Sequence, residues 1–184
     1  MPPELIDLAT FPALRFSIRY AGWDNFTGRP LPGYERPGAW LHESAAHALS
    51  RVVEGLAPRR LTLVVFDAYR PVRATRAMVE WCERHGREDL LNAYIGRTSR
   101  HSRGVAVDVG LAWRSSGAAL PMGTEWDTFH PGSWTAHATG IARANRRELL
   151  EAMTAEGFTP YEKEWWHFER LVDPLPPALD VPYG

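Results

Sequence analysis

Cysteine is nearly absent from this sequence. The single residue, Cys82, cannot form a disulfide within the chain and cannot build a thiolate-rich metal site by itself. Apolar runs are also short, and none has the length needed to cross a bilayer. The first residues lack the basic start and the long apolar stretch of a signal peptide. We therefore expect a protein that does not enter a membrane and that resides in the cytoplasm.

An excess of charge of either sign is missing as well. Lysine and arginine number 21, aspartate and glutamate number 22, and the net charge is −1. This balance would not drive binding to nucleic acid or to an anionic membrane, so we predict neither as a partner. Of the 184 residues, 45% are hydrophobic and 23% are charged, which is typical of a globular protein with its own core. We predict a single domain that spans residues 1–184.

The apolar pattern changes period several times along the chain. Apolar residues at helical spacing predict helices over residues 41–56, 72–85 and 141–156. Alternating or short apolar runs predict strands over residues 14–20, 61–66 and 104–111 and within 161–170. Gly- and Pro-rich residues 22–38 and irregular residues 113–135 predict long loops. Because helices and strands do not alternate regularly, we expect an α+β fold with an antiparallel or mixed sheet and packed helices.

Two short segments carry the residues that suggest chemistry. In the first, His101 is followed by Gly104 and Asp108; in the second, Glu164 precedes His167 by three positions. If residues 105–110 form a strand, the valines face one side and Asp108 faces the other. Gly104 lets the chain bend so that His101 reaches the same point. Two imidazoles and one carboxylate, with a separate carboxylate beside them, are what a catalytic zinc site requires.

Each half of this pattern also has a simpler interpretation. A His–Asp pair can be a buried hydrogen bond, and Glu164 can be a surface carboxylate beside Lys163. Arg70, which follows the predicted strand at 61–66, can form a structural ion pair with Asp67. The other histidines have no partners at metal spacing, and we predict surface or capping roles for them: His42, His47, His85, His130 and His137.

The two segments together resemble a known family. Ser-x-His-x-x-Gly-x-Ala-x-Asp at 99–108 and Glu-Trp-Trp-His at 164–167 are similar to the D-alanyl-D-alanine dipeptidases of the VanX type. These enzymes are zinc metallopeptidases related to D,D-carboxypeptidases and to the Hedgehog signalling domain. Residues 24–34, 67–71 and 122–127 also resemble motifs of the family, so the similarity extends from about residue 24 to residue 169. In the last motif the family leads us to expect Phe before Asp127, where this chain has Trp126.

The resemblance implies roles for five residues. It assigns His101, Asp108 and His167 as the ligands of one zinc ion per chain. Glu164 would be the catalytic base, and Arg70 would stabilise the charged intermediate. The implied fold is the α+β fold of the Hedgehog and D,D-peptidase group.

The resemblance also implies a substrate. Asp127 would hold the ammonium group of the dipeptide D-Ala-D-Ala, and Ser99 would hold its carboxylate end. The expected reaction is hydrolysis to two D-alanines, a reaction of cell-wall metabolism. Two alternatives stay open: a related zinc D,D- or L,D-carboxypeptidase that acts on peptidoglycan stem peptides, and a zinc-binding module without catalysis.

Overall fold

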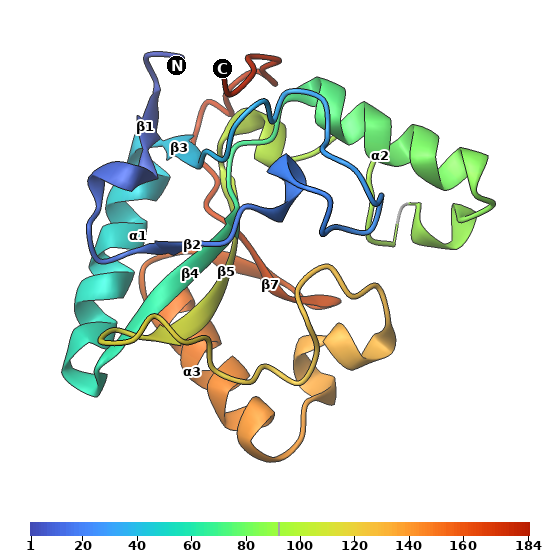
Figure 1. Ribbon diagram of the computed structural model, residues 1–184. Coiled ribbons are helices and arrows are strands. Elements are labelled where there is room, and N and C mark those ends of the chain that lie inside the picture. Colours follow the sequence, from blue (N-terminus) through green and yellow to red (C-terminus); the bar gives the residue numbers. More distant parts are fainter. Residues whose placement is uncertain (92) are drawn as a thin grey trace.

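The computed structural model describes residues 1–91 and 93–184, with a five-stranded mixed sheet at its centre (Figure 1). The order of strands across the sheet is β2, β4, β5, β7, β6. Their bounds are Arg15–Phe16 for β2, Leu61–Asp67 for β4, Ala106–Trp113 for β5, Glu164–Glu169 for β7 and Thr159–Tyr161 for β6. β2 is parallel to β4, and the other neighbouring pairs are antiparallel. A separate antiparallel pair joins β1 (Leu5–Asp7) to β3 (Trp40–His42).

Two helices cover the back of the large sheet in the view of Figure 1. α1 (Glu43–Leu56) contacts β4, α3 (Gly140–Ala155) contacts β5, and the two helices contact each other. α2 (Val72–Arg84) follows β4 and lies to the upper right of the view. Short 3₁₀ turns connect these elements: Leu8–Thr10, Arg19–Ala21, Ala57–Arg59, Glu88–Leu90, His101–Arg103, Pro131–Ser133 and Thr135–His137. The arrangement confirms the predicted α+β fold with a mixed sheet.

The central strands are apolar enough to be buried on both faces. Leu63, Val65, Val107 and Val109, which share one face, are all 0% exposed, and on the other face Ala106 and Ala112 are 0% exposed as well. Residues at helical spacing along α1, from Ala45 to Leu56, pack against this sheet in one hydrophobic core. Burial of this apolar surface is the main force that stabilises the sheet and its helices. The apolar patterns therefore identified the central strands and the three helices correctly, to within a few residues at each end.

Two predicted elements are longer than the structure shows. Of the strand predicted over residues 14–20, only residues 15–16 form a strand, β2. Its parallel partner β4 ends at Asp67, so the later residues have few positions of β4 to pair with. The chain then enters the 3₁₀ turn Arg19–Ala21, where Tyr20 is buried. The helix predicted from residue 41 begins at residue 43, because Leu41 belongs to β3 and pairs with Ile6 of β1.

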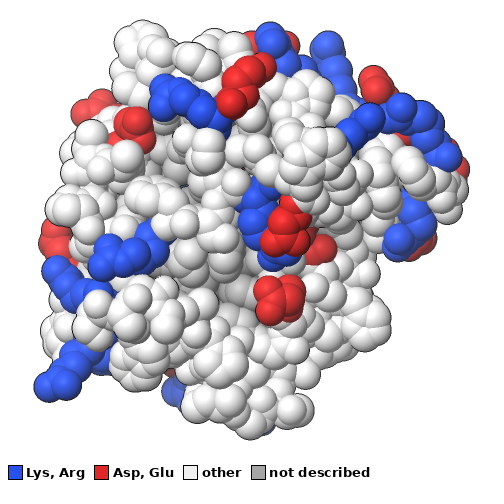
Figure 2. All heavy atoms as spheres, viewed as in Figure 1, with Lys and Arg blue, Asp and Glu red and all other residues white. Residues whose placement is uncertain are grey.

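The C-terminal residues after β7 contain no helix or strand, as their prolines predict. They still belong to the core, because Tyr183 is 0% exposed and its hydroxyl donates to the carbonyl of Tyr69 at 2.6 Å. Acidic and basic side chains are interspersed on the face drawn in Figure 2, and a small group of both lies near its centre. Within residues 1–91 and 93–184, none of the helices combines the length and the apolar character that a membrane crossing requires.

Candidate metal centre and active site

The pairing of β5 with β7 brings Asp108 and His167 together. These residues are direct partners in the antiparallel register, although they are far apart in the sequence. Side chains of directly opposed residues in an antiparallel pair lie close together on the same face. The apolar neighbours Val107 and Phe168 fix this register by their burial in the core.

The turn before β5 delivers His101 to the same point. His101 begins a 3₁₀ turn that ends at Gly104, which has a left-handed φ of 66°. A Cβ on Gly104 would lie 2.5 Å from Leu5 Cδ2 and 3.3 Å from the backbone nitrogen of His42. Glycine at this position therefore supplies both the sharp turn and the close approach to the small sheet.

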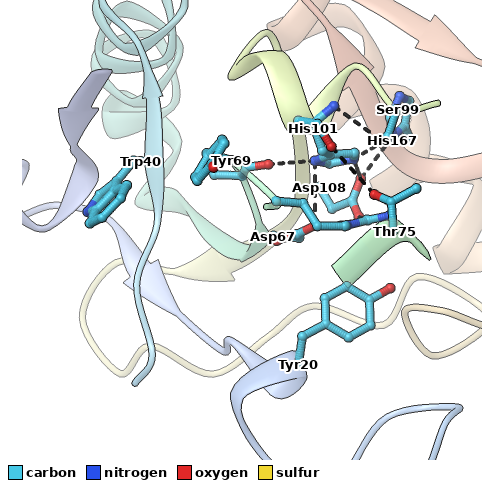
Figure 3. Close-up of polar contacts among 12 residues, drawn as sticks. Tyr20, Trp40, Asp67, Tyr69, Thr75, Ser99, His101, Asp108 and His167 are labelled. Atoms are coloured by element: carbon cyan, nitrogen blue, oxygen red, sulfur yellow. Dashed lines mark hydrogen bonds and ion pairs between the residues drawn. The ribbon is translucent and has the colours of Figure 1, made fainter. Parts of the chain in front are cut away.

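Three potential ligand atoms converge (Figure 3). Asp108 Oδ1 lies 3.0 Å from His167 Nδ1 and 3.3 Å from His101 Nε2. The two imidazole nitrogens are 3.1 Å apart. All three atoms lie within 4.8 Å of one another, so these residues could hold one metal ion. The predicted trio is thus brought together.

Each of these three side chains has a second polar atom that points away from the other two, and that atom contacts a neighbouring group. His101 Nδ1 lies 2.7 Å from the carbonyl oxygen of Ala68, which can only accept, so this nitrogen carries the proton and Nε2 has the lone pair. Trp126 Nε1 donates to Asp108 Oδ2 at 3.2 Å. His167 Nε2 lies 3.4 Å from a Glu169 oxygen. The atoms that remain for a metal are two imidazole nitrogens and one carboxylate oxygen, and all three point to the same place. This set of ligands fits a zinc ion whose fourth coordination position is open.

Glu164 faces the same site because β7 is irregular. In a regular strand, residues three apart point to opposite faces, so Glu164 and His167 would be separated. Here Pro160 pairs with Phe168 whereas Tyr161 pairs with Glu164, so residues 165–167 have no partner on β6. Glu164 Oε2 consequently lies 3.8 Å from His167 Nδ1, and the residue is only 8% exposed. Bulges of this kind re-aim side chains at functional sites.

A second irregularity positions Arg70 through Asp67. Val65 pairs with Val109 but Asp67 pairs with Asp108, so β4 carries one extra residue here. Arg70 Nε and Nη2 each lie 2.8 Å from Asp67 Oδ2. The same Nη2 lies 4.0 Å from Asp108 Oδ2, which places the guanidinium beside the three convergent ligand atoms.

Asp127 and Ser99 line the same pocket as the three convergent residues. The hydroxyl of Tyr20 lies 3.0 Å from each carboxylate oxygen of Asp127, a residue with a left-handed φ of 64°. Such a φ is unfavourable for a residue other than glycine and is often found at functional positions. Ser99 Oγ accepts from the backbone N–H of His101 at 3.2 Å. In this structure Ser99 therefore also helps to hold the turn that carries His101.

Burial shifts the pKa values of the acidic groups in the site. Burial raises the pKa of Glu164 to about 8 and that of Asp127 to about 7. Burial also opposes the ionisation of Asp108, but the imidazoles of His101 and His167 outweigh it and hold the Asp108 pKa well below its usual range. The site thus combines one firmly ionised carboxylate with two that titrate near neutrality.

One pocket of about 320 Å³ contains the whole arrangement. It is lined by all seven residues that the sequence analysis singled out: Arg70, Ser99, His101, Asp108, Asp127, Glu164 and His167. Apolar side chains form another part of the wall, among them Phe26 and Phe129 from loops and Met78 from α2. A pocket with apolar walls and a few convergent polar groups is the usual form of a small-molecule site.

Other residues of the site were missed in the sequence. Tyr20 is separated from Asp127 by 107 positions, and no local pattern links them. The sequence indicated only that Trp126 replaces the Phe expected for the family, whereas the structure shows that its indole N–H donates to Asp108. Glu169 could have been found, because alternation along a strand places it on the same face as His167.

This combination of groups is typical of a metal-dependent hydrolase. The chain belongs to the D-ala-D-ala dipeptidase family, whose family model matches residues 2–181. It is 36% identical over 182 residues to the D-alanyl-D-alanine dipeptidase of Escherichia coli, with 97% of this chain and 88% of that protein covered. It is 33% identical over 180 residues to the D-alanyl-D-alanine dipeptidase of Enterococcus faecium, with 89% of each covered. As a member of this metallopeptidase family, the chain is a hydrolase.

The fold is also found among solved structures. The LdcB LD-carboxypeptidase superposes with a TM-score of 0.52 at 18% identity, over 92% of this chain and 68% of that chain. At this level of identity the likeness concerns the arrangement of strands and helices alone.

Proposed function

We propose that this chain is a zinc-dependent dipeptidase that hydrolyses D-Ala-D-Ala to two D-alanines. The observation that carries the proposal is the convergence of His101 Nε2, Asp108 Oδ1 and His167 Nδ1 within 4.8 Å. Membership of the D-ala-D-ala dipeptidase family supports the substrate. The curated relatives that match most of the chain are D-alanyl-D-alanine dipeptidases, which supports it further.

The three convergent residues are proposed as the ligands of one zinc ion. Two neutral imidazoles and one carboxylate leave a net positive charge of about one unit on the ion. Bound zinc acts as a Lewis acid that lowers the pKa of a water ligand to about 7 and polarises a peptide carbonyl. The three protein groups would hold this ion through their convergent atoms, while their outward atoms contact Ala68, Trp126 and Glu169.

Glu164 is proposed as the general base. Its Oε2 lies 3.8 Å from His167 Nδ1, so Glu164 would be close to a water molecule held by a bound zinc ion. It takes the proton of the attacking water and returns it to the leaving amine. Burial raises the pKa of Glu164 to about 8 without the metal, and a nearby cation lowers the pKa toward neutrality. A group that titrates near neutral pH can both accept and donate the proton.

Arg70 is proposed to stabilise the oxyanion that forms from the peptide carbonyl. Its guanidinium is permanently charged and is held in place by Asp67, so it needs no rearrangement as charge develops. Its Nη2 lies 4.0 Å from Asp108 Oδ2, close to the proposed metal site, and Arg70 lines the same pocket.

Asp127 and Ser99 are proposed to recognise the two charged ends of a free dipeptide. Asp127 would accept the ammonium group, and Ser99 would donate its hydroxyl to the carboxylate. A longer peptide has no free ammonium at the same place, so the buried Asp127 would lack a cationic partner, which disfavours binding. This geometry favours a dipeptidase over an enzyme that trims stem peptides.

The proposal is tested by measuring D-alanine release from D-Ala-D-Ala by the purified protein. We expect one zinc ion per chain by metal analysis, activity that a chelator abolishes, and recovery when zinc is restored. L-Ala-L-Ala and a pentapeptide that ends in D-Ala-D-Ala serve as control substrates. Faster release from the pentapeptide would support the carboxypeptidase alternative, and zinc without turnover would support the non-catalytic module.

A further inference from the structure

Glu169 lies next to the imidazole of His167 on the side away from the other ligands. The two residues are two positions apart on β7, so their side chains point to the same face. Glu169 Oε1 lies 3.4 Å from His167 Nε2, and Glu169 also lines the pocket. The other ring nitrogen, Nδ1, faces Asp108 Oδ1 at 3.0 Å.

The chemistry of imidazole connects these two contacts. A neutral imidazole carries one proton, and the nitrogen that binds a metal must be the one without it. If Nδ1 of His167 binds the metal, Nε2 must carry the proton and needs an acceptor. Glu169 Oε1 is an acceptor at hydrogen-bond distance from that nitrogen.

The other two proposed ligands are held in the same manner. The carbonyl of Ala68 accepts from His101 Nδ1 at 2.7 Å, and Trp126 Nε1 donates to Asp108 Oδ2 at 3.2 Å. His101 Nδ1 also lies 3.5 Å from Asp67 Oδ2, so each of the two imidazoles has a carboxylate near its outward nitrogen. A carboxylate in that place both fixes the ring and increases the basicity of the nitrogen that faces the metal.

We propose that Glu169 is a positioning residue for His167: it fixes the ring and the tautomer so that Nδ1 is presented to zinc. The inference rests on the proposed zinc site. Arg100 supports the arrangement, because its Nε lies 3.6 Å from Glu169 Oε2 and keeps that oxygen turned away from the imidazole. Both side chains are partly exposed, so the contribution of this ion pair is small.

The first test is the zinc dissociation constant, measured by competition with a chelator of known affinity. Glu169→Ala removes the acceptor, and we expect zinc to bind about 10–100-fold more weakly. Glu169→Gln keeps an oxygen acceptor of the same length but removes the charge, so it is expected to restore most of the affinity. Glu162→Gln is the matched control, because Glu162 is exposed on the neighbouring turn and has the same charge. It should bind zinc like the unsubstituted protein.

A second measurement follows the tautomer itself. In ¹⁵N-labelled zinc-loaded protein, long-range ¹H–¹⁵N spectra distinguish a protonated Nε2 from a metal-bound Nδ1 for each histidine. We expect the Nε2–H signal of His167 to be protected from exchange with water in the unsubstituted protein and in Glu169→Gln. The signal should be lost to exchange in Glu169→Ala, while the signals of His101 stay unchanged. A general loss of folding would alter both histidines.

The outcomes separate the two proposals. If the unsubstituted protein does not bind zinc, the proposed function fails. If it binds zinc and Glu169→Ala binds within about twofold of it, with the His167 signal unchanged, the positioning role is overturned. If Glu169→Ala does not fold, the comparison of Glu169→Gln with Glu162→Gln decides: loss of the protected Nε2–H signal in Glu169→Gln alone would contradict the role of the oxygen acceptor.

Discussion

Arg70 and Asp67 meet through a single oxygen: both Nε and Nη2 of Arg70 lie 2.8 Å from Asp67 Oδ2. The other oxygen of Asp67 accepts from the hydroxyl of Tyr34 at 2.5 Å. The sequence left open whether Arg70 forms a structural ion pair or takes part in catalysis. The ion pair is present, and it turns the guanidinium toward Asp108, so the two interpretations are compatible.

Replacing the guanidinium with a point charge tests this geometry. We expect Arg70→Lys to lower kcat for D-Ala-D-Ala by about 100–1000-fold, because a lysine cannot contact Asp67 and the developing oxyanion at the same time. Zinc content should stay the same, since Arg70 is not a proposed ligand. Arg73→Lys is the control: Arg73 pairs with Asp180 at the surface, 3.0 Å away. Steady-state kinetics decide, and a kcat within about tenfold of the unsubstituted enzyme would refute the role of Arg70.

The role of Glu164 is tested by removing only its ability to exchange a proton. Glu164→Gln keeps the shape of the side chain, so we expect normal zinc binding and a kcat reduced by at least about 100-fold. Glu162→Gln, two residues earlier and exposed, should keep the full kcat. Steady-state kinetics measure kcat, and metal analysis measures the zinc content. Turnover of Glu164→Gln close to that of the control would remove Glu164 from the mechanism.

The metal ligands could be anticipated because their placement follows local rules. Alternation along the strand at 104–111 predicted that Asp108 would face away from the valines, and Gly104 predicted the bend that carries His101. The pairing partner of Asp108 could be named only through the family resemblance, because a register between β5 and β7 depends on core packing across 59 residues.

The irregular features could not be anticipated. Regular alternation would have separated Glu164 from His167, and only the register shift between β6 and β7 unites them. That shift arises from how Pro160 and Tyr161 meet their neighbours, which is a tertiary effect. The contact of Tyr20 with Asp127 is equally non-local, since it depends on a turn where the sequence pattern indicated a strand.

Trp126 offers a test of a residue that departs from the pattern expected for the family. Its indole N–H donates to Asp108 Oδ2 at 3.2 Å, a bond that the expected Phe could not form. We expect Trp126→Phe to weaken zinc binding by about tenfold, because Asp108 loses a group that orients it. Trp113→Phe is the control, since Trp113 is 47% exposed at the end of β5. Equal zinc affinities for the two variants, measured by chelator competition, would show that the indole N–H is dispensable.

The metal-free protein should become less stable as the pH rises. Burial disfavours a charged His167, but Asp108 and Glu169 outweigh burial and raise its pKa from the ordinary 6.5 to about 10. A raised folded-state pKa contributes stability that is fully present below pH 6.5 and is lost as the pH rises through 10. Burial raises the pKa of Glu164 from 4.5 to about 8, so this group also reduces stability, between pH 4.5 and 8.

Thermal unfolding at pH 6 and at pH 9, with chelator and with zinc, measures this effect. We expect the Tm of the metal-free protein to be lower at pH 9, and zinc to raise the Tm more at pH 9 than at pH 6, because zinc competes less with protons for the imidazoles as the pH rises. A metal-free Tm that stays constant or increases between the two pH values would contradict these pKa shifts.

Two glycines with the same backbone conformation allow two effects to be told apart at the turn that carries His101: backbone strain and the steric clash of an added Cβ. Gly104 and Gly86 have φ values of 66° and 63°. A Cβ on Gly86 would meet no atom within 4 Å, whereas a Cβ on Gly104 would lie 2.5 Å from Leu5 Cδ2.

Alanine at either position adds about 1–2 kcal/mol of strain, because an L-residue is unfavourable in the left-handed conformation. Gly104→Ala also forces Leu5 or the turn to move, so its free energy of unfolding should fall further, by about 1–3 kcal/mol. Urea unfolding of the metal-free variants measures the difference, and zinc affinity should fall only in Gly104→Ala. Equal losses of stability in the two variants would mean that the packing of the turn against β1 does not hold His101 in place.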